Sequence, residues 1–319
     1  MKTVIVTGAA GFIGSTLVGS LLKNKFRVIG IDNFTNFYAK KIKQKNISDY
    51  KKNKNFIFLQ KNILNTNLST LLKKSDYLFH LAAQPGVRSS WGKQFSNYVE
   101  NNILVTQKIL EEAKSVNSLK KIVIASSSSV YGRNNGKMNE TKTSLTPHSP
   151  YGVSKLTTEK LADVYVNNFS LPITTLRYFT VYGPRQRPDM SFMNFMVKSL
   201  QKKSITVFGN GKQKRDFTYV DDIVNATLSC LKLKESGNIL NIGGGSVVSI
   251  NKIISIIQKF SNSEMKISYK DFPDGDVLRT ESDISKARKL IDYKPKTSIK
   301  DGIEKQFEYV KKYHKMYKN

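Results

Sequence analysis

The residues best suited to proton transfer are Tyr151 and Lys155, which stand four apart after Pro150 in the stretch PYGVSK. Proline is favoured in the first turn of a helix, and residues four apart share one face, so the ammonium can lie near the phenol or near the ribose beside it. A nearby cation lowers a tyrosine pKa from about 10 toward neutrality, where the phenol can act as a base. A second such pair, Tyr50 and Lys54, lies in a polar lysine-rich segment, and we interpret it as chance.

Four serines, Ser126 to Ser129, follow the stretch KIVIA at 121–125, whose apolar and β-branched residues predict a buried strand. Polar residues just beyond such a strand usually line the site of an α/β protein. Tyr151 belongs to the next helical pattern along the chain. Its position in the order of elements, rather than the Tyr-x-x-x-Lys spacing, makes Tyr151 the catalytic candidate.

A glycine-rich turn, GAAGFIG, follows the strand-like residues 4–7 and opens a helical pattern. Its glycines, Gly8, Gly11 and Gly14, let backbone amides approach a pyrophosphate at a helix N-terminus. The second predicted strand ends at Asp32, where a carboxylate binds ribose hydroxyls and repels a 2′-phosphate. These residues predict a dinucleotide site that prefers NAD to NADP. The alternative is a convenient turn and an ordinary turn aspartate.

Strand-like and helical patterns alternate through the first part of the chain. This alternation predicts an α/β fold with a Rossmann-type, doubly wound parallel sheet. After Thr180 the pattern loosens, which indicates a smaller α/β C-terminal region, although the strand-like residues 238–243 can return to the first sheet. We expect a Rossmann domain over 1–180, joined by about 218–243, and a discontinuous second domain over 181–319. The expected strands are 4–7, 26–31, 56–59, 76–83, 121–125 and 173–177, and the expected helices are 12–22, 98–114 and 150–169.

The composition argues against a membrane protein and against a secreted one. The 319 residues contain no run of about 18 apolar residues that would span a membrane. The start, MKTVIVTG, has too short an apolar part for a signal peptide, and the single cysteine, Cys230, fits a reducing compartment. We expect a cytoplasmic protein that contacts no membrane. His80, His148 and His314 lack the spacing of a metal site, so we expect no metal.

The formal net charge is +28, because lysines far outnumber acidic residues. A basic surface attracts nucleic acid or an acidic membrane, and its field also steers small anionic substrates. The lysines are scattered, and the clusters at 40–45 and 51–54 resemble solvated helix faces. Because no recognised motif accompanies them, we predict no nucleic-acid partner. General lysine-rich composition and steering of a small anion remain the two explanations.

Five motifs occur in an order typical of one family: TGAAGFIG, HLAA at 80–83, SSSSVYG, YGVSK and LRYFTVYGPRQRPDM. In these motifs the chain resembles the extended short-chain dehydrogenases/reductases, which include NAD-dependent nucleotide-sugar epimerases and dehydratases. The resemblance covers essentially the whole chain. It implies NAD in the Rossmann domain, a nucleotide sugar in the smaller domain, and a catalytic triad of Ser127, Tyr151 and Lys155.

The resemblance also implies which residues contact the cofactor. One departure from the family is Asn62, where many members carry Asp near the adenine; its amide can still form a hydrogen bond. The implied cofactor contacts are Gly8, Gly11, Phe12, Ile13, Gly14, Asp32, Asn33, Asn62, Ile63, Leu81, Ala82, Ala83, Asn101, Tyr151 and Lys155.

The residues after Ser127 separate the reactions of this family. Dehydratases resemble STDEVYG and nucleotide-glucuronate decarboxylases resemble STSEVYG, whereas this chain has Ser128 and Ser129 at the acidic positions. Elimination needs a proton donor and acceptor beside the ring, which neutral hydroxyls provide poorly. What remains is 4-epimerisation of a nucleotide sugar, and the resemblance implies that the nucleotide is UDP. In that reaction Tyr151 takes the O4 proton, hydride passes from C4 to NAD, and hydride returns to the other face of the 4-keto sugar.

Hydroxyls in place of carboxylates also suit a sugar that carries its own carboxylate at C5. Thr180 stands where epimerases of neutral sugars usually carry Asn. The nearby motifs supply Arg88, Arg185 and Arg187, and an arginine fork binds a carboxylate bidentately. In these stretches the chain resembles UDP-glucuronate 4-epimerases. The alternative is that Arg185 and Arg187 anchor the diphosphate or lie in solvent. The predicted carboxylate contacts are Ser128, Ser129, Thr180 and Arg187.

The predicted contacts with the nucleotide part of the substrate and the predicted dimer depend on the same resemblance. Residues 205–223 resemble the wall beside uridine, with Phe208 near the base and Arg215 on the diphosphate, while Arg279 is either a second such contact or a surface residue. The helices predicted at 98–114 and 150–169 resemble those that form the family's dimer bundle, which predicts a homodimer. Packing of these helices on the sheet explains their stripes of apolar residues equally well. The implied substrate contacts are Arg88, Ser127, Ser128, Ser129, Tyr151, Thr180, Arg187, Phe208, Arg215 and Arg279.

The sequence thus predicts an NAD-dependent UDP-sugar 4-epimerase, with UDP-glucuronate and UDP-galacturonate as its substrate and product. The first alternative is the same reaction on UDP-glucose or UDP-N-acetylglucosamine. Less favoured are a UDP-glucuronate decarboxylase and a non-catalytic NAD-binding protein, since a pure binder has no need of a phenol–ammonium pair.

Overall fold

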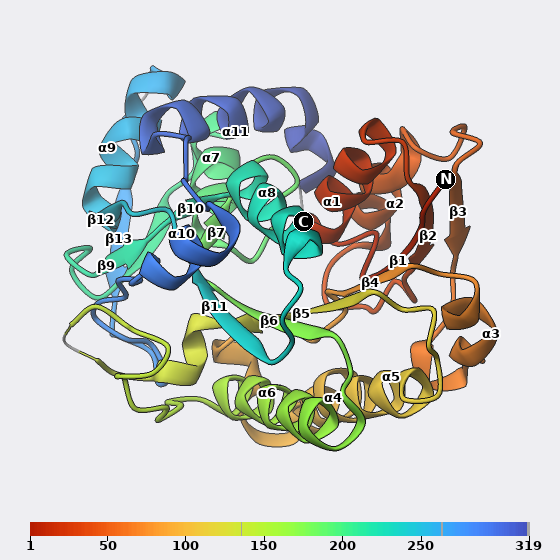
Figure 1. The fold of residues 1–319 in the computed structure, drawn as a ribbon. Helices are drawn as coiled ribbons and strands as arrows, with labels where there is room; N and C mark the ends of the chain where they lie inside the picture. The colour runs from red at the N-terminus through yellow and green to blue at the C-terminus, as the bar shows by residue number, and fades with distance from the viewer. Residues whose placement is uncertain (135, 263, 318–319) are drawn as a thin grey trace.

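A parallel sheet forms the centre of the computed structural model, which describes residues 1–134, 136–262 and 264–317; within them the sheet is seven-stranded. The strand order is β11-β6-β5-β4-β1-β2-β3, and neighbouring strands run parallel (Figure 1). The order reverses beside β1, and ligands of such sheets bind at that reversal, beyond the carboxyl ends of the strands. The predicted Rossmann-type fold is confirmed. The strands are β1 Thr3–Thr7, β2 Arg27–Ile31, β3 Phe56–Leu59, β4 Tyr77–His80, β5 Lys121–Ser127, β6 Ile173–Tyr178 and β11 Asn238–Ile242.

Helices alternate with the central strands, as the sequence pattern predicts. None of the helices in the described residues is long and apolar enough to cross a membrane. The α-helices are α1 Phe12–Lys23, α2 Lys40–Ser48, α3 Leu68–Lys73, α4 Phe95–Tyr98, α5 Val105–Ala113, α6 Pro150–Phe169, α7 Ser191–Leu200, α8 Val220–Ser229, α9 Ile250–Ser261, α10 Ser285–Ile291 and α11 Ile299–Tyr313. The 3₁₀ turns are η1 Ile63–Asn65, η2 Arg88–Ser90, η3 Gly92–Gln94, η5 Ser128–Tyr131, η6 Cys230–Lys232 and η7 His314–Tyr317.

Helices cover both faces of the central sheet (Figure 1). Val4 and Val6 of β1 pack in an apolar cluster with residues of α1 and α8. Ile5, between them, faces the other way and packs in a second cluster with residues of α5 and α6. Successive side chains of a strand point to opposite faces, so a strand covered on both sides reads as a continuous apolar run. This explains why β1 shows no polar alternation in the sequence.

The region after β6 contains short strands outside the central sheet. Three pairs of strands, β7 with β10, β8 with β13 and β9 with β12, form two-stranded sheets within the described residues, and α7, α9 and α11 pack together beside them (Figure 1). One segment of this region returns: β11 lies in the central sheet beside β6. The strands are β7 Val181–Tyr182, β8 Ile205–Phe208, β9 Lys214–Asp216, β10 Thr218–Tyr219, β12 Val247–Ser249 and β13 Ile267–Lys270.

The helix predicted at 98–114 differs in the structure. It begins earlier, as α4, and its turn Val99–Leu104 is a π-helix that leads into α5. A π-helical turn inserts an extra residue into the helix and often occurs at functional sites. Here that turn carries Asn101, which lines the cavity described below.

A buried ion pair joins β5, β6 and α6 at the level of the serine run. Arg177 of β6 donates from Nε and Nη2 to the two carboxylate oxygens of Glu159 on α6, at 2.9 and 2.7 Å, and each residue is only 1% exposed. The hydroxyl of Ser126, near the end of β5, donates to the same carboxylate. The remaining Nη1 of Arg177 donates to the Tyr131 hydroxyl, which donates to Asn241 of β11 at 2.8 Å. The network thus fixes the strand that carries the serines against the helix that carries Tyr151.

The Glu159→Gln variant should lower the free energy of unfolding by roughly 3 to 5 kcal/mol, because it leaves the buried guanidinium of Arg177 without its counter-charge. Urea denaturation of the purified variant measures this. Combining it with Arg177→Met should recover part of the loss, since no uncompensated charge then remains buried. Glu308→Gln removes an exposed ion pair with Lys311 and should change stability by less than about 1 kcal/mol. Equal effects at the two glutamates would contradict the assigned role of the pair.

Candidate dinucleotide and sugar site

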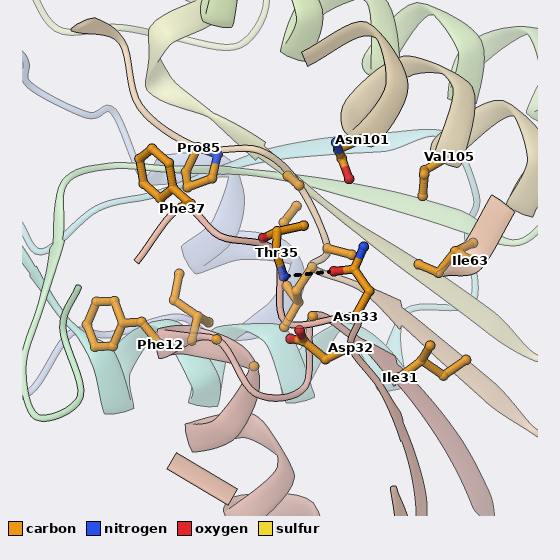
Figure 2. A pocket seen from close by; sticks show the side chains of 18 of the residues that line it. Phe12, Ile31, Asp32, Asn33, Thr35, Phe37, Ile63, Pro85, Asn101 and Val105 are labelled. Atoms are coloured by element: carbon orange, nitrogen blue, oxygen red, sulfur yellow. Dashed lines mark hydrogen bonds between the residues drawn. The ribbon is translucent and has the colours of Figure 1, made fainter. Parts of the chain in front are cut away.

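A cavity lies at the carboxyl ends of β1, β2, β4 and β5. The structure brings to its walls every residue that the sequence predicts to contact the cofactor, from Gly8 to Lys155. Figure 2 shows Asp32, Asn33 and Thr35 along one wall, opposite Asn101 and Val105. Its further lining residues, which the sequence analysis did not assign to the cofactor, are Ile31, Thr35, Phe37, Tyr38, Lys43, Lys61, Pro85, Val105, Ala125, Ser126, Tyr178 and Arg187.

The glycine turn between β1 and α1 leaves no room for side chains. Gly8 has φ +68° and its N–H donates to the carbonyl of Ile31 at 2.8 Å. A Cβ on Gly14 would lie 2.1 Å from the carbonyl oxygen of Gly8. Gly11 caps α1 and has no side chain to occupy the first N–H groups of the helix. These N–H groups at the positive end of the helix fit a pyrophosphate.

Asp32, at the end of β2, is held by the backbone around it. Its carboxylate accepts the N–H of Ala10 at 3.1 Å and the N–H of Phe34 at 2.8 Å. Burial raises the pKa of Asp32, and the Phe34 N–H and the charge of Lys43 oppose that rise. The carboxylate therefore lies beside the glycine turn, where ribose hydroxyls of a bound dinucleotide fit.

The predicted catalytic side chains lie on β5 and on the first turns of α6. The Ser127 hydroxyl accepts the N–H of Ser129 at 3.1 Å and donates to the hydroxyl of Ser129 at 3.1 Å. Ser149 caps α6 with its hydroxyl and Pro150 begins the helix, so Tyr151 and Lys155 share one face. The Lys155 ammonium donates to the carbonyl of Ala125 at 2.7 Å. Burial lowers the pKa of Lys155 to about 8, opposed by the charge of Glu159 one turn later.

The structure corrects the predicted electrostatics of Tyr151. The pKa of Tyr151 is raised above its usual value because burial penalises the phenolate more than its neighbours favour it. A hydrogen bond with Ser127 and the charge of Arg187 lower the pKa, and these contributions come from outside the Tyr-x-x-x-Lys pair. The ammonium of Lys155 is directed to the Ala125 carbonyl instead. Ser127 and Arg187 are therefore neighbours that favour the phenolate, and the place of the Lys155 ammonium beside the phenol or a bound ribose stays a prediction.

The two arginines of PRQRPDM point to different places. Arg187 lines the cavity, and its Nε and Nη2 donate to the carboxylate of Asp189 at 3.0 and 2.9 Å. Arg185 points away, donating from Nη1 to the carbonyl of Ser15 at 3.2 Å and to the hydroxyl of Tyr50 at 2.7 Å. Neither predicted alternative for Arg185, a diphosphate contact or a solvent position, describes this contact. Tyr50, assigned to a chance pair, thus anchors Arg185 to the segment after α2.

The hydroxyl-bearing residues predicted to hold a sugar carboxylate lie just outside that cavity. In the described chain the lining includes Ser126 and Arg187 but not Ser128, Ser129 or Thr180. Ser128 and Ser129 form the 3₁₀ turn after β5 and are half-buried. Thr180 follows β6, and its carbonyl accepts the N–H of Thr218 at 2.9 Å. The serine turn and Thr180 therefore extend two neighbouring strands of the sheet.

Arg88 lies with the residues predicted for the nucleotide end, rather than with the serines. Its guanidinium stacks 4.0 Å from the ring centre of Phe208 and donates to Asp276 at 2.7 Å. The pKa of Arg215 is lowered by burial, an effect that Asp276 opposes and the charge of Arg88 strengthens, so the three side chains share one neighbourhood. Arg279 is exposed and forms an ion pair with Glu281.

The side chains that α2 and the preceding segment contribute to the cavity were not predicted from the sequence. The cluster at 40–45 is not wholly a solvated face, because Lys43 is only 5% exposed. A signal existed: Lys43 is three and four residues before Asn46 and Ile47, which are also buried. Phe37 and Tyr38 show no such helical spacing in the sequence, because their segment is irregular.

The parallel sheet, the glycine turn and the carboxylate at the end of β2 define a Rossmann-type dinucleotide-binding protein. A family model described as GDP-mannose 4,6 dehydratase matches residues 5–306, and the chain belongs to that family of extended short-chain dehydrogenases/reductases.

Similar proteins carry more specific names. A protein of Bacillus subtilis (strain 168), named an uncharacterized UDP-glucose epimerase, is 47% identical over 309 residues, or 96% of this chain and 97% of that one. A UDP-glucuronate 4-epimerase of Thermodesulfobacterium geofontis (strain OPF15) is 39% identical over 98% of this chain and 97% of its own. The crystal structure of UDP-glucuronic acid 4-epimerase from Bacillus cereus, in complex with UDP-glucuronic acid and NAD, is similar with a TM-score of 0.95 at 47% identity. That likeness covers 97% of this chain and 99% of the other.

The Gly14→Ala variant should weaken NAD binding about ten- to a hundredfold, because its Cβ would displace the backbone of Gly8. Titration calorimetry on cofactor-stripped protein measures the change. Gly136→Ala is the control, since a Cβ there meets no atom within 4 Å among the described residues. Unchanged affinity in the Gly14 variant would remove the glycine turn from the binding site.

Proposed function

We propose that the protein is an NAD-dependent UDP-glucuronate 4-epimerase that interconverts UDP-glucuronate and UDP-galacturonate. The observation that carries this proposal is the pairing of neutral hydroxyls, Ser128 and Ser129, beyond the strand that ends in Ser127, with the guanidinium of Arg187 on the side of Tyr151. A site without a carboxylate at the serine turn, but with a cation beside the phenol, suits a substrate that brings its own carboxylate. The similarity to UDP-glucuronate 4-epimerases supports it.

The residues of the site suit the reaction as follows. NAD, when bound, supplies the hydride acceptor for C4. Tyr151 takes the O4 proton, and Ser127 and Arg187 stabilise the phenolate that the transfer needs. Lys155, held by the Ala125 carbonyl, places a positive charge on the same helix face. Residues Gly8 to Gly14 and Asp32 hold the pyrophosphate and a ribose.

The proposed carboxylate contacts also have a protective role. The intermediate of this reaction is a 4-keto uronate, a β-keto acid, which loses carbon dioxide when its carboxylate bond stands perpendicular to the ketone plane. Contacts from Ser128, Ser129, Thr180 and Arg187 at several points would hold the group away from that geometry. Phe208 and Arg215, beside Arg88, would bind the uracil and the diphosphate, and Arg279 is assigned to the same end.

A second candidate is a 4-epimerase of a neutral UDP-sugar such as UDP-glucose or UDP-N-acetylglucosamine. One observation favours it: the fork of Arg187 already holds the carboxylate of Asp189, so its charge is partly balanced without a uronate. The guanidinium has five N–H donors, however, and the pair with Asp189 uses only its Nε edge. Within the described residues its Nη1 forms no hydrogen bond, so this edge can bind a second carboxylate.

We further assign the cofactor to residues 1–180 with about 218–243, and the UDP-sugar to the remainder of 181–319. We place the protein in the cytoplasm as a homodimer. The dimer proposal rests on α6 and the π-helical turn, which leave large apolar side chains exposed. These are Val153 (47% exposed), Val164 (52%), Phe169 (48%) and Leu104 (49%).

Purified protein incubated with UDP-glucuronate should produce UDP-galacturonate and no pentose, followed by the sugar H4 and anomeric signals in proton NMR. Arg187→Ala should lower kcat/KM for UDP-glucuronate about ten- to a hundredfold, the value of a lost charge-assisted hydrogen bond. Arg187→Lys should recover only part, because it keeps the charge and loses the fork.

UDP-glucose, run beside it, provides the control. Conversion of UDP-glucose alone would keep the epimerase and rule out the carboxylate contacts. A pentose product would identify a decarboxylase instead. Loss of activity by Arg187→Ala on both sugars in equal measure would make Arg187 a catalytic residue without a role in specificity.

The Val164→Glu variant should halve the molar mass in solution, from a dimer to the 36.1 kDa of one chain, because it buries a charge in an apolar interface. Light scattering after size exclusion measures this, with circular dichroism to check the fold. Leu278→Glu, at a side chain that is 72% exposed on another surface segment, should leave the mass unchanged. A monomeric unsubstituted protein would contradict the proposal.

A further inference from the structure

Residues 33–38 form an irregular segment between β2 and α2 that lines one wall of the dinucleotide cavity. Asp32 accepts the N–H of Phe34, which has φ +54°, and Asn33 accepts the N–H of Thr35 at 3.2 Å (Figure 2). These contacts fold the start of the segment tightly against the end of β2. We call residues 33–38 the strap.

Lys43 fastens this strap from α2. Its ammonium donates to the carbonyl of Thr35 at 2.7 Å and to the hydroxyl of Thr35 at 3.0 Å, and it lies 4.7 Å from the ring centre of Tyr38. The residue is 5% exposed, whereas its neighbours Lys40 and Lys41 on the same helix are exposed. Burying an ammonium is unfavourable unless it is fully hydrogen-bonded, so Lys43 is held inside by its contacts with the strap.

The far end of the strap reaches the proposed sugar site. The ring of Phe37 lies 5.7 Å from the guanidinium of Arg187. A Cβ on Gly86 would lie 3.4 Å from the same ring, and Figure 2 shows Phe37 beside Pro85. The strap therefore extends from Asp32, at the ribose side of the cavity, to Arg187, at its reactive side.

We propose that Lys43 is a positioning residue that fixes residues 33–38 along the cavity and so retains the reduced cofactor between the two hydride transfers. This proposal rests on the proposed epimerisation. The first half-reaction moves hydride from C4 to NAD and the O4 proton to Tyr151, giving NADH and a ketone. The second half returns the same hydride, so no outside oxidant or reductant takes part. An enzyme that lost NADH at this point would release an unreduced 4-keto sugar and stop.

Lys43→Met should release cofactor at least about tenfold faster than the unsubstituted protein, because it removes charge-assisted hydrogen bonds to the strap while keeping a chain of similar length. Holoenzyme loaded with NADH is mixed with excess NAD, and the decay of NADH fluorescence gives the release rate. Lys41→Met, an exposed lysine on the same helix, is the matched control and should release at the unsubstituted rate.

Phe37→Ala and Thr35→Val test the same strap if Lys43→Met fails to fold by circular dichroism. Phe37→Ala removes the contact at the reactive end, and Thr35→Val removes one of the two acceptors of Lys43, so both should speed release. Release at the unsubstituted rate in a folded Lys43→Met protein, or in both of the other variants, would overturn the proposal.

The release assay contains no UDP-sugar, so its result is independent of the proposed substrate. Fast release of NADH by Lys43→Met supports the role of the strap even if the protein converts no UDP-sugar. A failure to convert any UDP-sugar would instead contradict the proposed function. With UDP-glucuronate present, the variant should also accumulate free NADH and a 4-keto sugar, both of which the Lys41→Met protein should retain. A variant that releases NADH quickly but forms no free ketone during turnover would contradict the role assigned between the half-reactions.

Discussion

The ion pair between Arg177 and Glu159 fixes the geometry on which the rest of the site depends. Two charges that are taken out of water repay their desolvation only when the hydrogen-bonding geometry is good. Here the pair is bidentate, and Ser126 and Tyr131 satisfy the remaining groups. Because Glu159 stands one turn after Lys155 on α6, the position of the reactive helix face is set by the same contact that holds the serine strand. The charge of Glu159 also raises the pKa of Lys155 against the effect of burial.

A second constraint is the loop after β7, in which consecutive residues reach different parts of the molecule. Arg185 donates to the carbonyl of Ser15 on α1. Gln186, only 1% exposed, accepts the N–H of Met193 at 3.0 Å and a hydrogen bond from Gln306 of α11 at 2.8 Å. Arg187, between these anchors and Asp189, is therefore placed by contacts with α1 and with the smaller region together.

The sequence was most informative where the local backbone accepts only one type of residue. Gly14 is predictable because no side chain fits beside Gly8, and the parallel sheet is predictable from apolar runs that recur between helices. Arg187 was chosen over Arg185 only through the resemblance to a family, because the direction in which each arginine points depends on the tertiary fold. Lys43 was missed since a lysine cluster is usually solvated, and its burial depends on the tertiary position of Thr35. The raised pKa of Tyr151 likewise depends on burial, which no spacing reveals.

Although the protein is strongly basic, several arginines that the sequence assigned to the substrate are already paired with acidic side chains. Arg187 pairs with Asp189, Arg88 with Asp276 and Arg279 with Glu281, so acidic side chains of the chain itself already balance these guanidinium groups. Arg215 forms no ion pair of this kind within the described residues, and burial lowers its pKa. The absence of such a pair supports the diphosphate contact that we propose for Arg215. If the remaining positive charge steers an anionic substrate, it acts at long range, and its effect on the association rate should weaken with salt.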